Sequence, residues 1–240
     1  MKFFDTHIHF ADIKDSKYSI EKLISQGINK FIAVSILEKD WEQISNLYQQ
    51  YPNNIVPAFG LHPWYIRDAK PGWEERLEAI LLKHPEALVG ETGLDRHKDH
   101  EFEPQNSFFK THIELAKKLS RPLIIHAVKS QDWLENYWKI LPAKFVFHSY
   151  NNRRELMKKI LSHGGYISFS QAMLQNRERG KIAVFPPSNR LMIETDAPYQ
   201  DLAENLINTA KDLAAIRKEN LEDFAANTYQ TAQEFIKIEK

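Results

Sequence analysis

Residues 3–10 read Phe3-Phe4-Asp5-Thr6-His7-Ile8-His9-Phe10, an apolar stretch that becomes polar toward its end. In a β-strand, side chains alternate with a period of two, so Asp5, His7 and His9 are expected to share one face. Two imidazoles on one strand face can present ring nitrogens to a single cation, and a carboxylate behind them can fix their tautomers. A His-x-His pair is a weak signal by itself in a chain with 10 histidines. Its meaning depends on what the later strands contribute.

Strands and helices are expected to alternate along the rest of the chain. Further strands are predicted at residues 30–36, 55–60, 87–91, 122–127, 144–149, 166–170 and 191–196. Helices between them are predicted at 19–26, 40–51 with Asp40 as its N-cap, 73–84, 105–119, 131–140, 153–163 and, more weakly, 177–184, followed by two helices at 202–217 and 221–238. Eight strands separated by helices predict an α/β protein folded as a closed (β/α)8 TIM barrel. Residues 1–240 are expected to form this barrel as a single domain.

Composition limits the classes of function. The 32 basic and 32 acidic residues give a formal net charge of zero, so no overall field draws the protein to nucleic acid or to an anionic membrane. The chain has no cysteine, which excludes disulfides, thiolate metal sites and a cysteine nucleophile. No apolar run approaches the roughly 18 residues of a membrane span. We expect a cytoplasmic monomer that does not associate with membranes.

Polar side chains collect at the predicted carboxyl ends of the strands, where (β/α)8 enzymes have their active sites. In chain order these are His7, His9, Ser35, His62, Glu91, His126, His148, Ser170 and Asp196. Buried histidines and acids are unfavourable unless they are paired or ligated. The set exceeds what one tetrahedral cation needs, so we predict two divalent ions about 3.5–4 Å apart, with Glu91 as the bridge. Nitrogen and oxygen ligands allow zinc, nickel, manganese or magnesium.

Six motifs, in order along nearly the whole chain, resemble those of the TatD family of metal-dependent hydrolases. They are Asp5-Thr6-His7-Ile8-His9, Gly60-Leu61-His62-Pro63-Trp64, Gly90-Glu91-Thr92-Gly93-Leu94-Asp95, Ile125-His126, His148-Ser149 and Glu194-Thr195-Asp196-Ala197-Pro198-Tyr199. The resemblance implies an amidohydrolase-type barrel with deoxyribonuclease or related phosphodiesterase activity. The leading hypothesis is a 3'-to-5' exonuclease that cleaves DNA. It also implies one metal held by His7, His9, Glu91 and Asp196, and another held by Glu91, His126 and His148.

Two other classes of function stay open for this chain. The same metal centre could hydrolyse acyl or amide bonds, as in a D-aminoacyl-tRNA deacylase, and the zero net charge slightly favours a short substrate over a long polyanion. A metal-binding module without catalysis is the third class, although a pure scaffold would not need the full set of ligands. In either enzymatic reading Asp196 and Glu91 are the catalytic carboxylates, with Asp196 accepting a proton from the attacking water.

The sequence departs from the usual TatD pattern in segments that are expected to form the rim of the substrate site. Arg96 stands where an aromatic residue is usual, and Lys129 lies in a segment that usually carries an arginine and an acid. The chain also shortens after Tyr199. We expect His62, Arg96 and Lys129 to contact a nucleic-acid or nucleotide-like substrate. Trp64 and Tyr65 either stack against a base or pack within their loop.

The remaining polar candidates are assigned to supporting or surface positions. Asp5 and Glu194 are expected to support the metal ligands from behind. The other histidines are expected at the surface: His84, His97, His100, His112 and His163.

Overall fold

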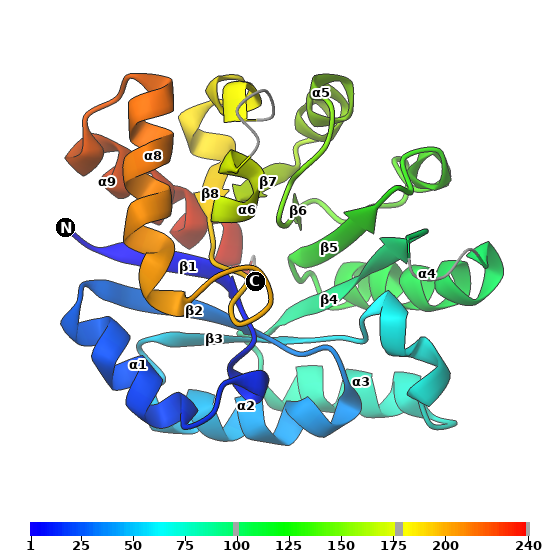
Figure 1. The fold of residues 1–240 in the computed structure, drawn as a ribbon. Helices are drawn as coiled ribbons and strands as arrows, with labels where there is room; N and C mark the ends of the chain where they lie inside the picture. Colours follow the sequence, from blue (N-terminus) through cyan, green and yellow to red (C-terminus); the bar gives the residue numbers. More distant parts are fainter. Residues whose placement is uncertain (98–100, 176–179, 239–240) are drawn as a thin grey trace.

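The computed structural model describes residues 1–97, 101–175 and 180–238. Its centre is a sheet of eight parallel strands in the order of the sequence, with helices outside (Figure 1). The strands are β1 (Phe3–Ile8), β2 (Ile28–Val34), β3 (Ile55–Phe59), β4 (Leu88–Asp95), β5 (Leu123–Val128), β6 (Phe145–Phe147), β7 (Tyr166–Phe169) and β8 (Leu191–Ile193). The backbone closes the ring beyond the last strand, because Asp196 donates its N–H to the His7 carbonyl (3.0 Å) and His9 donates to the Ala197 carbonyl (2.9 Å). The predicted (β/α)8 barrel is confirmed.

Helices cover the outside of the barrel. They are α1 (Ser16–Ser25), α2 (Glu38–Gln50), α3 (Trp73–Lys83), α4 (Phe102–Lys118), α5 (Arg154–Ser162), the short α6 (Gln171–Leu174), α8 (Leu206–Arg217) and α9 (Leu221–Ile236). Short 3-10 helices lie at Phe10–Asp12, Pro63–Asp68, Trp133–Asn136, Lys181–Val184, Ser188–Arg190 and Ala203–Asn205. None of the helices in the described part of the chain is long and apolar enough to cross a membrane.

Two layers of apolar side chains hold this architecture together. One layer lies between the strands and the surrounding helices, and the other fills the barrel interior. Residues from α9 belong to the interior layer: the Phe235 ring lies 5.2 Å from that of Tyr166, and the Tyr229 ring lies 5.8 Å from that of Phe4. Both partners stand near the starts of their strands, so α9 closes the amino-terminal end of the barrel. The carboxyl-terminal end is left for polar side chains.

The prediction of a helix at residues 131–140 is wrong, because only the 3-10 turn Trp133–Asn136 forms there. Tertiary contacts decide this segment. The Trp133 ring packs 5.0 Å from Phe102 and the Tyr137 ring 4.7 Å from Phe109, both on α4. Aromatic residues have only modest helix propensity, so packing against α4 overrides a weak helical pattern. Of the helix predicted at 177–184, residues 177–179 lie outside the described residues, and Lys181–Val184 form a 3-10 turn.

Helix boundaries differ from prediction at the start of α2. Leu37, not Asp40, is the N-cap, and Asp40 stands three positions further on. Its carboxylate reaches back and accepts the backbone N–H groups of Ile36 (3.1 Å) and Leu37 (2.9 Å). A carboxylate in the first turn can satisfy N–H groups that have no partner within the helix. The residue was therefore correctly linked to the helix start but was placed at the wrong position in it.

Two histidines expected at the surface are buried in the structure. His84 is 4 % exposed and bonds to the Ser45 hydroxyl at 2.8 Å, while His112 is 0 % exposed. His112 accepts the N–H of Leu61 at its Nε2 (3.1 Å), and its Nδ1 lies 2.7 Å from the Phe108 carbonyl. This histidine is thus bonded on both nitrogens and fixes the backbone next to His62. His97 and His163 are exposed as expected, and His100 lies outside the described residues.

Replacing His112 with Gln should change how stability depends on pH. Burial lowers the pKa of His112 from 6.5 to about 4, so the folded protein keeps this ring neutral while the unfolded chain protonates it below pH 6.5. Acidification therefore destabilises the wild type through this residue. We expect the difference in unfolding free energy between wild type and variant to shrink by about 2 kcal/mol from pH 7 to pH 5. Urea denaturation at both pH values measures it, and equal differences would contradict the assignment.

Candidate metal centre

The predicted ligands converge at the carboxyl-terminal end of the barrel, on the floor of a pocket of about 360 Å³. His9, Glu91, His126, His148 and Asp196 line this pocket, and His7 lies beneath it. His7 lies on β1, Glu91 on β4 and His126 on β5, and the other three follow β1, β6 and β8. Apart from His126, which is partly exposed, these side chains are buried. The structure therefore gathers at one place all six residues that were predicted to hold metal.

The first group of donor atoms comprises His7, His9, Glu91 and Asp196. His7 Nε2 lies 3.2 Å from His9 Nε2 and 3.1 Å from Glu91 Oε2. Asp196 Oδ1 lies 3.0 Å from His9 Nε2 and 3.8 Å from His7 Nε2, and Glu91 Oε2 lies 3.7 Å from His9 Nε2. Ligands about 2.0–2.1 Å from a tetrahedral cation lie roughly 3.3 Å from one another. The spacing of this group fits such a cation.

The second group comprises His126, His148 and the other oxygen of Glu91. His126 Nδ1 lies 3.2 Å from His148 Nε2 and 3.0 Å from Glu91 Oε1, and His148 Nε2 lies 2.8 Å from the same oxygen. The two oxygens of Glu91 thus face different groups of donors. This is the arrangement that a bridging carboxylate requires.

His62 lies closer to this second group than a residue that contacts only substrate would need to be. Its Nε2 is 3.3 Å from Glu91 Oε1, and burial lowers its pKa to about 4, so its ring is neutral. Because Nδ1 accepts the Trp64 backbone N–H at 3.1 Å, the proton of the neutral ring is on Nε2, which donates toward Glu91. His62, Glu91 and His126 lie close enough to form one of the clusters of possible metal ligands, but this tautomer makes His62 a donor. Substrate contact by His62 stays a prediction.

The protonation of the site fits cations. Burial acts to raise the pKa of Glu91, but the nearby His148, His62 and His7 outweigh it and hold that pKa well below its ordinary value. Burial also acts to raise the pKa of Asp196, and its hydrogen bond with His9 together with the charges of His7, His148 and His9 outweighs burial. Both carboxylates are therefore ionised. Each pair of nitrogens 3.2 Å apart can share one proton in an N–H···N hydrogen bond, and a cation bound to both lone pairs takes the place of that proton.

Glycines permit the strands that carry these ligands to approach closely. Gly93 on β4 pairs with His126 on β5 at a φ of 149°, and a Cβ there would lie 2.0 Å from the His126 carbonyl oxygen. Directly after β3, a Cβ at Gly60 would lie 2.7 Å from the Glu91 carbonyl oxygen. Any larger residue would push the neighbouring strand away. The glycines around Glu91 therefore set the distance between the two groups of donors.

The supporting carboxylates act in two different ways. Asp5 accepts the backbone N–H groups of His7 (3.2 Å) and Thr195 (3.0 Å) and the Thr195 hydroxyl (2.6 Å). Asp5 therefore joins β1 to the end of β8. The expectation that it fixes the tautomer of a histidine ring is not met, because it contacts no ring nitrogen in these hydrogen bonds. Glu194 Oε1 lies 3.5 Å from His148 Nδ1 and accepts the backbone N–H of Ser149, so it supports a ligand from behind. In the described residues, the Nδ1 atoms of His7 and His9 have no hydrogen-bond partner.

Two polar residues beside the centre were not assigned a role from the sequence. Asp95 Oδ2 lies 2.9 Å from His126 Nε2, and it accepts the Trp64 indole N–H at 2.6 Å. Gln200 donates its amide N–H to Asp196 Oδ2 at 2.5 Å, and its Oε1 accepts the hydroxyls of Ser149 (2.9 Å) and Ser170 (3.0 Å). Period-2 spacing from Glu91 along β4 could have identified Asp95. No periodic pattern marks Gln200, which lies in a loop.

The two basic residues predicted to contact substrate have different surroundings. Arg96 pairs with Asp132 (2.6 Å), and its guanidinium stacks 4.3 Å from the centre of the Trp133 ring. Both interactions turn it toward the protein. Lys129 Nζ lies 3.1 Å from His97 Nδ1 and borders a groove next to the metal pocket. Substrate contact by either residue stays a prediction, and the structure favours Lys129.

The sequence of this chain is similar to a known protein family and to several curated proteins. Residues 4–237 match the family model described as TatD related DNase. An uncharacterized metal-dependent hydrolase of Haemophilus influenzae is 27 % identical over 97 % of this chain and 98 % of its own length. The uncharacterized metal-dependent hydrolase YjjV of Escherichia coli is 28 % identical over 84 % of this chain and 81 % of its own length.

Solved structures show the same fold. The crystal structure of YjjV, a TatD homologue from Escherichia coli, superposes with a TM-score of 0.90 at 24 % identity over 97 % of both chains. A TatD-family hydrolase from Entamoeba histolytica superposes with a TM-score of 0.87 at 21 % identity, covering 98 % of both chains.

Proposed function

The chain belongs to the TatD related DNase family of metal-dependent hydrolases, and we propose that it hydrolyses phosphodiester bonds in DNA, as a 3'-to-5' exonuclease. The observation that carries this proposal is the placement of Glu91, whose Oε2 faces His7 and whose Oε1 faces His126 and His148. One carboxylate between two groups of donors suits a pair of divalent cations. In such sites the cations activate a water molecule and neutralise charge that develops on phosphoryl oxygens.

The residues of the chain supply the proton transfer. Asp196 Oδ1 belongs to the first group of donors, while Oδ2 accepts the Gln200 amide and faces the pocket. Oδ2 is thus the oxygen that takes the proton of the attacking water as the water oxygen bonds to phosphorus and the phosphorus–oxygen bond to the leaving group breaks. Gln200 fixes the orientation of this carboxylate by holding it from the loop side. The low pKa of Asp196 keeps it ionised at neutral pH, so this carboxylate carries no proton before the water attacks.

Aromatic side chains at the mouth of the pocket are suited to bases. Trp64 is 39 % exposed and Tyr199 is 51 % exposed, and both line the pocket together with the partly buried Tyr65. Their orientation is fixed, because the Trp64 indole bonds to Asp95 and the Tyr199 hydroxyl donates to Asp12 at 3.0 Å. Exposed aromatic faces that are held in place stack on nucleobases with little dependence on sequence.

A panel of substrates tests the proposed function. With added manganese or magnesium, we expect single-stranded DNA labelled at its 5' end to be shortened stepwise from the 3' end. Chelation of the metal should abolish this cleavage and added divalent ion should restore it. The Asp196→Asn variant serves as the inactive control against contaminating nucleases. Hydrolysis of D-aminoacyl-tRNA without any cleavage of DNA would contradict the proposal and favour the acyl hydrolase.

A further inference from the structure

We propose that the groove between residues 127–131 and 149–153 binds the part of a DNA strand that flanks the scissile bond, with Arg153 contacting a backbone phosphate. This inference rests on the proposed function and names the form of the substrate. It predicts that the enzyme prefers an oligonucleotide to a mononucleotide ester.

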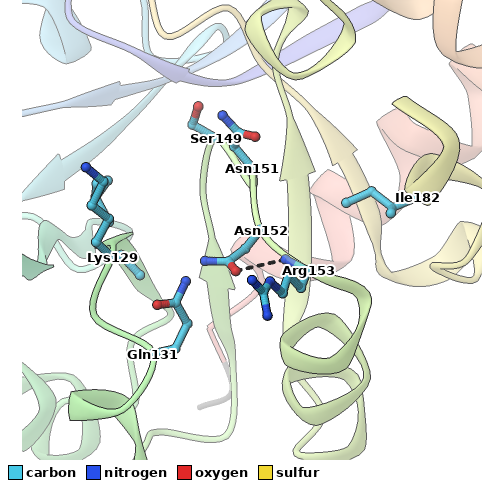
Figure 2. Close-up of a pocket in the computed structure, with 9 residues that line it drawn as sticks. Lys129, Gln131, Ser149, Asn151, Asn152, Arg153 and Ile182 are labelled. Atoms are coloured by element: carbon cyan, nitrogen blue, oxygen red, sulfur yellow. Dashed lines mark hydrogen bonds between the residues drawn. The ribbon is translucent and has the colours of Figure 1, made fainter. Parts of the chain in front are cut away.

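The groove opens beside the metal pocket. Its volume is about 530 Å³, and Val128 lines both the groove and the metal pocket. Ser149, which follows the predicted ligand His148, also lines it. Figure 2 shows Lys129 and Gln131 on the side of the loop after β5, opposite Asn152 and Arg153, which directly precede α5. A chain held at the metals can therefore continue directly into this groove.

The charged side chains that line the groove are both basic. They are Lys129 and Arg153, and no carboxylate among the described residues lines it. The backbone N–H of Arg153 donates to Asn152 Oδ1 at 2.8 Å, but its guanidinium has no hydrogen bond or ion pair with any residue that the structure describes. Arg96, by contrast, is held by Asp132. Within residues 1–97, 101–175 and 180–238, Arg153 is thus a guanidinium next to the centre that can still pair with an anion.

This chemistry suits a polynucleotide backbone. A guanidinium binds phosphate oxygens in pairs, and a lysine ammonium adds a second positive charge across the groove. The amides of Gln131 and Asn152 provide donors and acceptors for sugars and base edges. Because the whole chain has a net charge of zero, a polyanion must be recognised by such a local pair of cations. Gln131, Asn152 and Arg153 also line a second hollow of about 510 Å³, but Glu135 and Glu155 line it too, so the surface suited to a polyanion is the first groove.

An Arg153→Ala variant tests the groove, and Arg154→Ala is its matched control. Arg154 is the next residue, is exposed, and stacks 3.5 Å from the centre of the Phe185 ring, away from the groove lining. The probe is fluorescent single-stranded DNA of about 12 nucleotides, a length within the usual range of such sites. Anisotropy on the metal-free protein measures binding, and steady-state kinetics compare this DNA with the small diester bis(p-nitrophenyl) phosphate.

We expect Arg153→Ala to weaken DNA binding roughly 5- to 20-fold, the effect of losing one charge-assisted phosphate contact. The ratio of kcat/KM for DNA over kcat/KM for the small diester should fall by a similar factor. The slope of log Kd against log salt concentration should decrease by about 0.7, the value for one phosphate contact on a single strand. Arg153→Lys should recover part of the affinity, and Arg154→Ala should match the wild type.

The outcomes separate the groove from the proposed function. If the wild type cleaves DNA while Arg153→Ala keeps its affinity, its substrate ratio and its salt slope, the groove assignment is wrong and the nuclease function stands. A loss of affinity with an unchanged salt slope would show that Arg153 acts through structure alone, which also overturns the assignment. If the wild type neither binds nor cleaves DNA, both proposals are wrong.

Discussion

Asp196→Asn is expected to lower kcat by on the order of 10² to 10⁴ at saturating metal, with little change in the fold. Asp196 ends the barrel beside the first group of donors, where Oδ1 meets His9 and Oδ2 meets Gln200. An amide cannot accept a proton from water, and it binds a cation more weakly than a carboxylate. Asparagine fills almost the same space and also tolerates the positive φ of 56° at this position.

The measurement combines kcat at saturating manganese with thermal melting and metal content. Asp223→Asn is a suitable control, because Asp223 is an exposed carboxylate in the first turn of α9, at the closed end of the barrel. It should retain wild-type turnover. A folded, metal-loaded Asp196→Asn protein with the wild-type rate would show that another group takes the proton.

Glu91→Gln is expected to remove metal from both groups of donors at once. The two oxygens of Glu91 are each within 3.1 Å of a predicted ligand from a different group, His7 on one side and His126 or His148 on the other. An amide has one oxygen and no charge, so one group loses its oxygen and both lose the negative charge that the imidazoles keep on Glu91 against the effect of burial. Bound metal should fall from about two ions per chain to nearly none.

His126→Asn is the comparison that gives this result its meaning. His126 contacts Glu91 Oε1 but not the pair formed by His7 and His9, so about one ion should remain. Elemental analysis after dialysis against metal-free buffer measures the content of both variants. If both variants lose the same amount of metal, Glu91 is not the bridge.

The barrel and the gathering of the six predicted ligands followed from the sequence because both depend on strong local patterns. Apolar strands alternate with helices, and in a parallel barrel the residue after each strand must face the same end. The spacing of Asp5, His7 and His9 was a less reliable guide, since the register between β1 and β2 shifts after Asp5. Asp5 consequently bonds to Thr195 and to the backbone of His7.

The features that the sequence did not predict depend on tertiary packing. His112 lies in a helix with an ordinary amphipathic pattern, and only the fold brings Leu61 against its ring. Gln200 and Arg153 stand in loops, where no period indicates the direction of a side chain. Arg96 looked like a free cation until the structure placed Asp132 beside it. Pairing between charges on separate loops cannot be read from their positions along the chain.

Anomalous diffraction from crystals grown with excess zinc or manganese tests the central claim most directly. The account predicts two peaks at the carboxyl-terminal end of the barrel, one bonded to His7 and His9 and the other to His126 and His148, with Glu91 in contact with both. A single peak that leaves Glu91 without a bridging role would contradict the account, as would metal bound elsewhere while these histidines stay unligated.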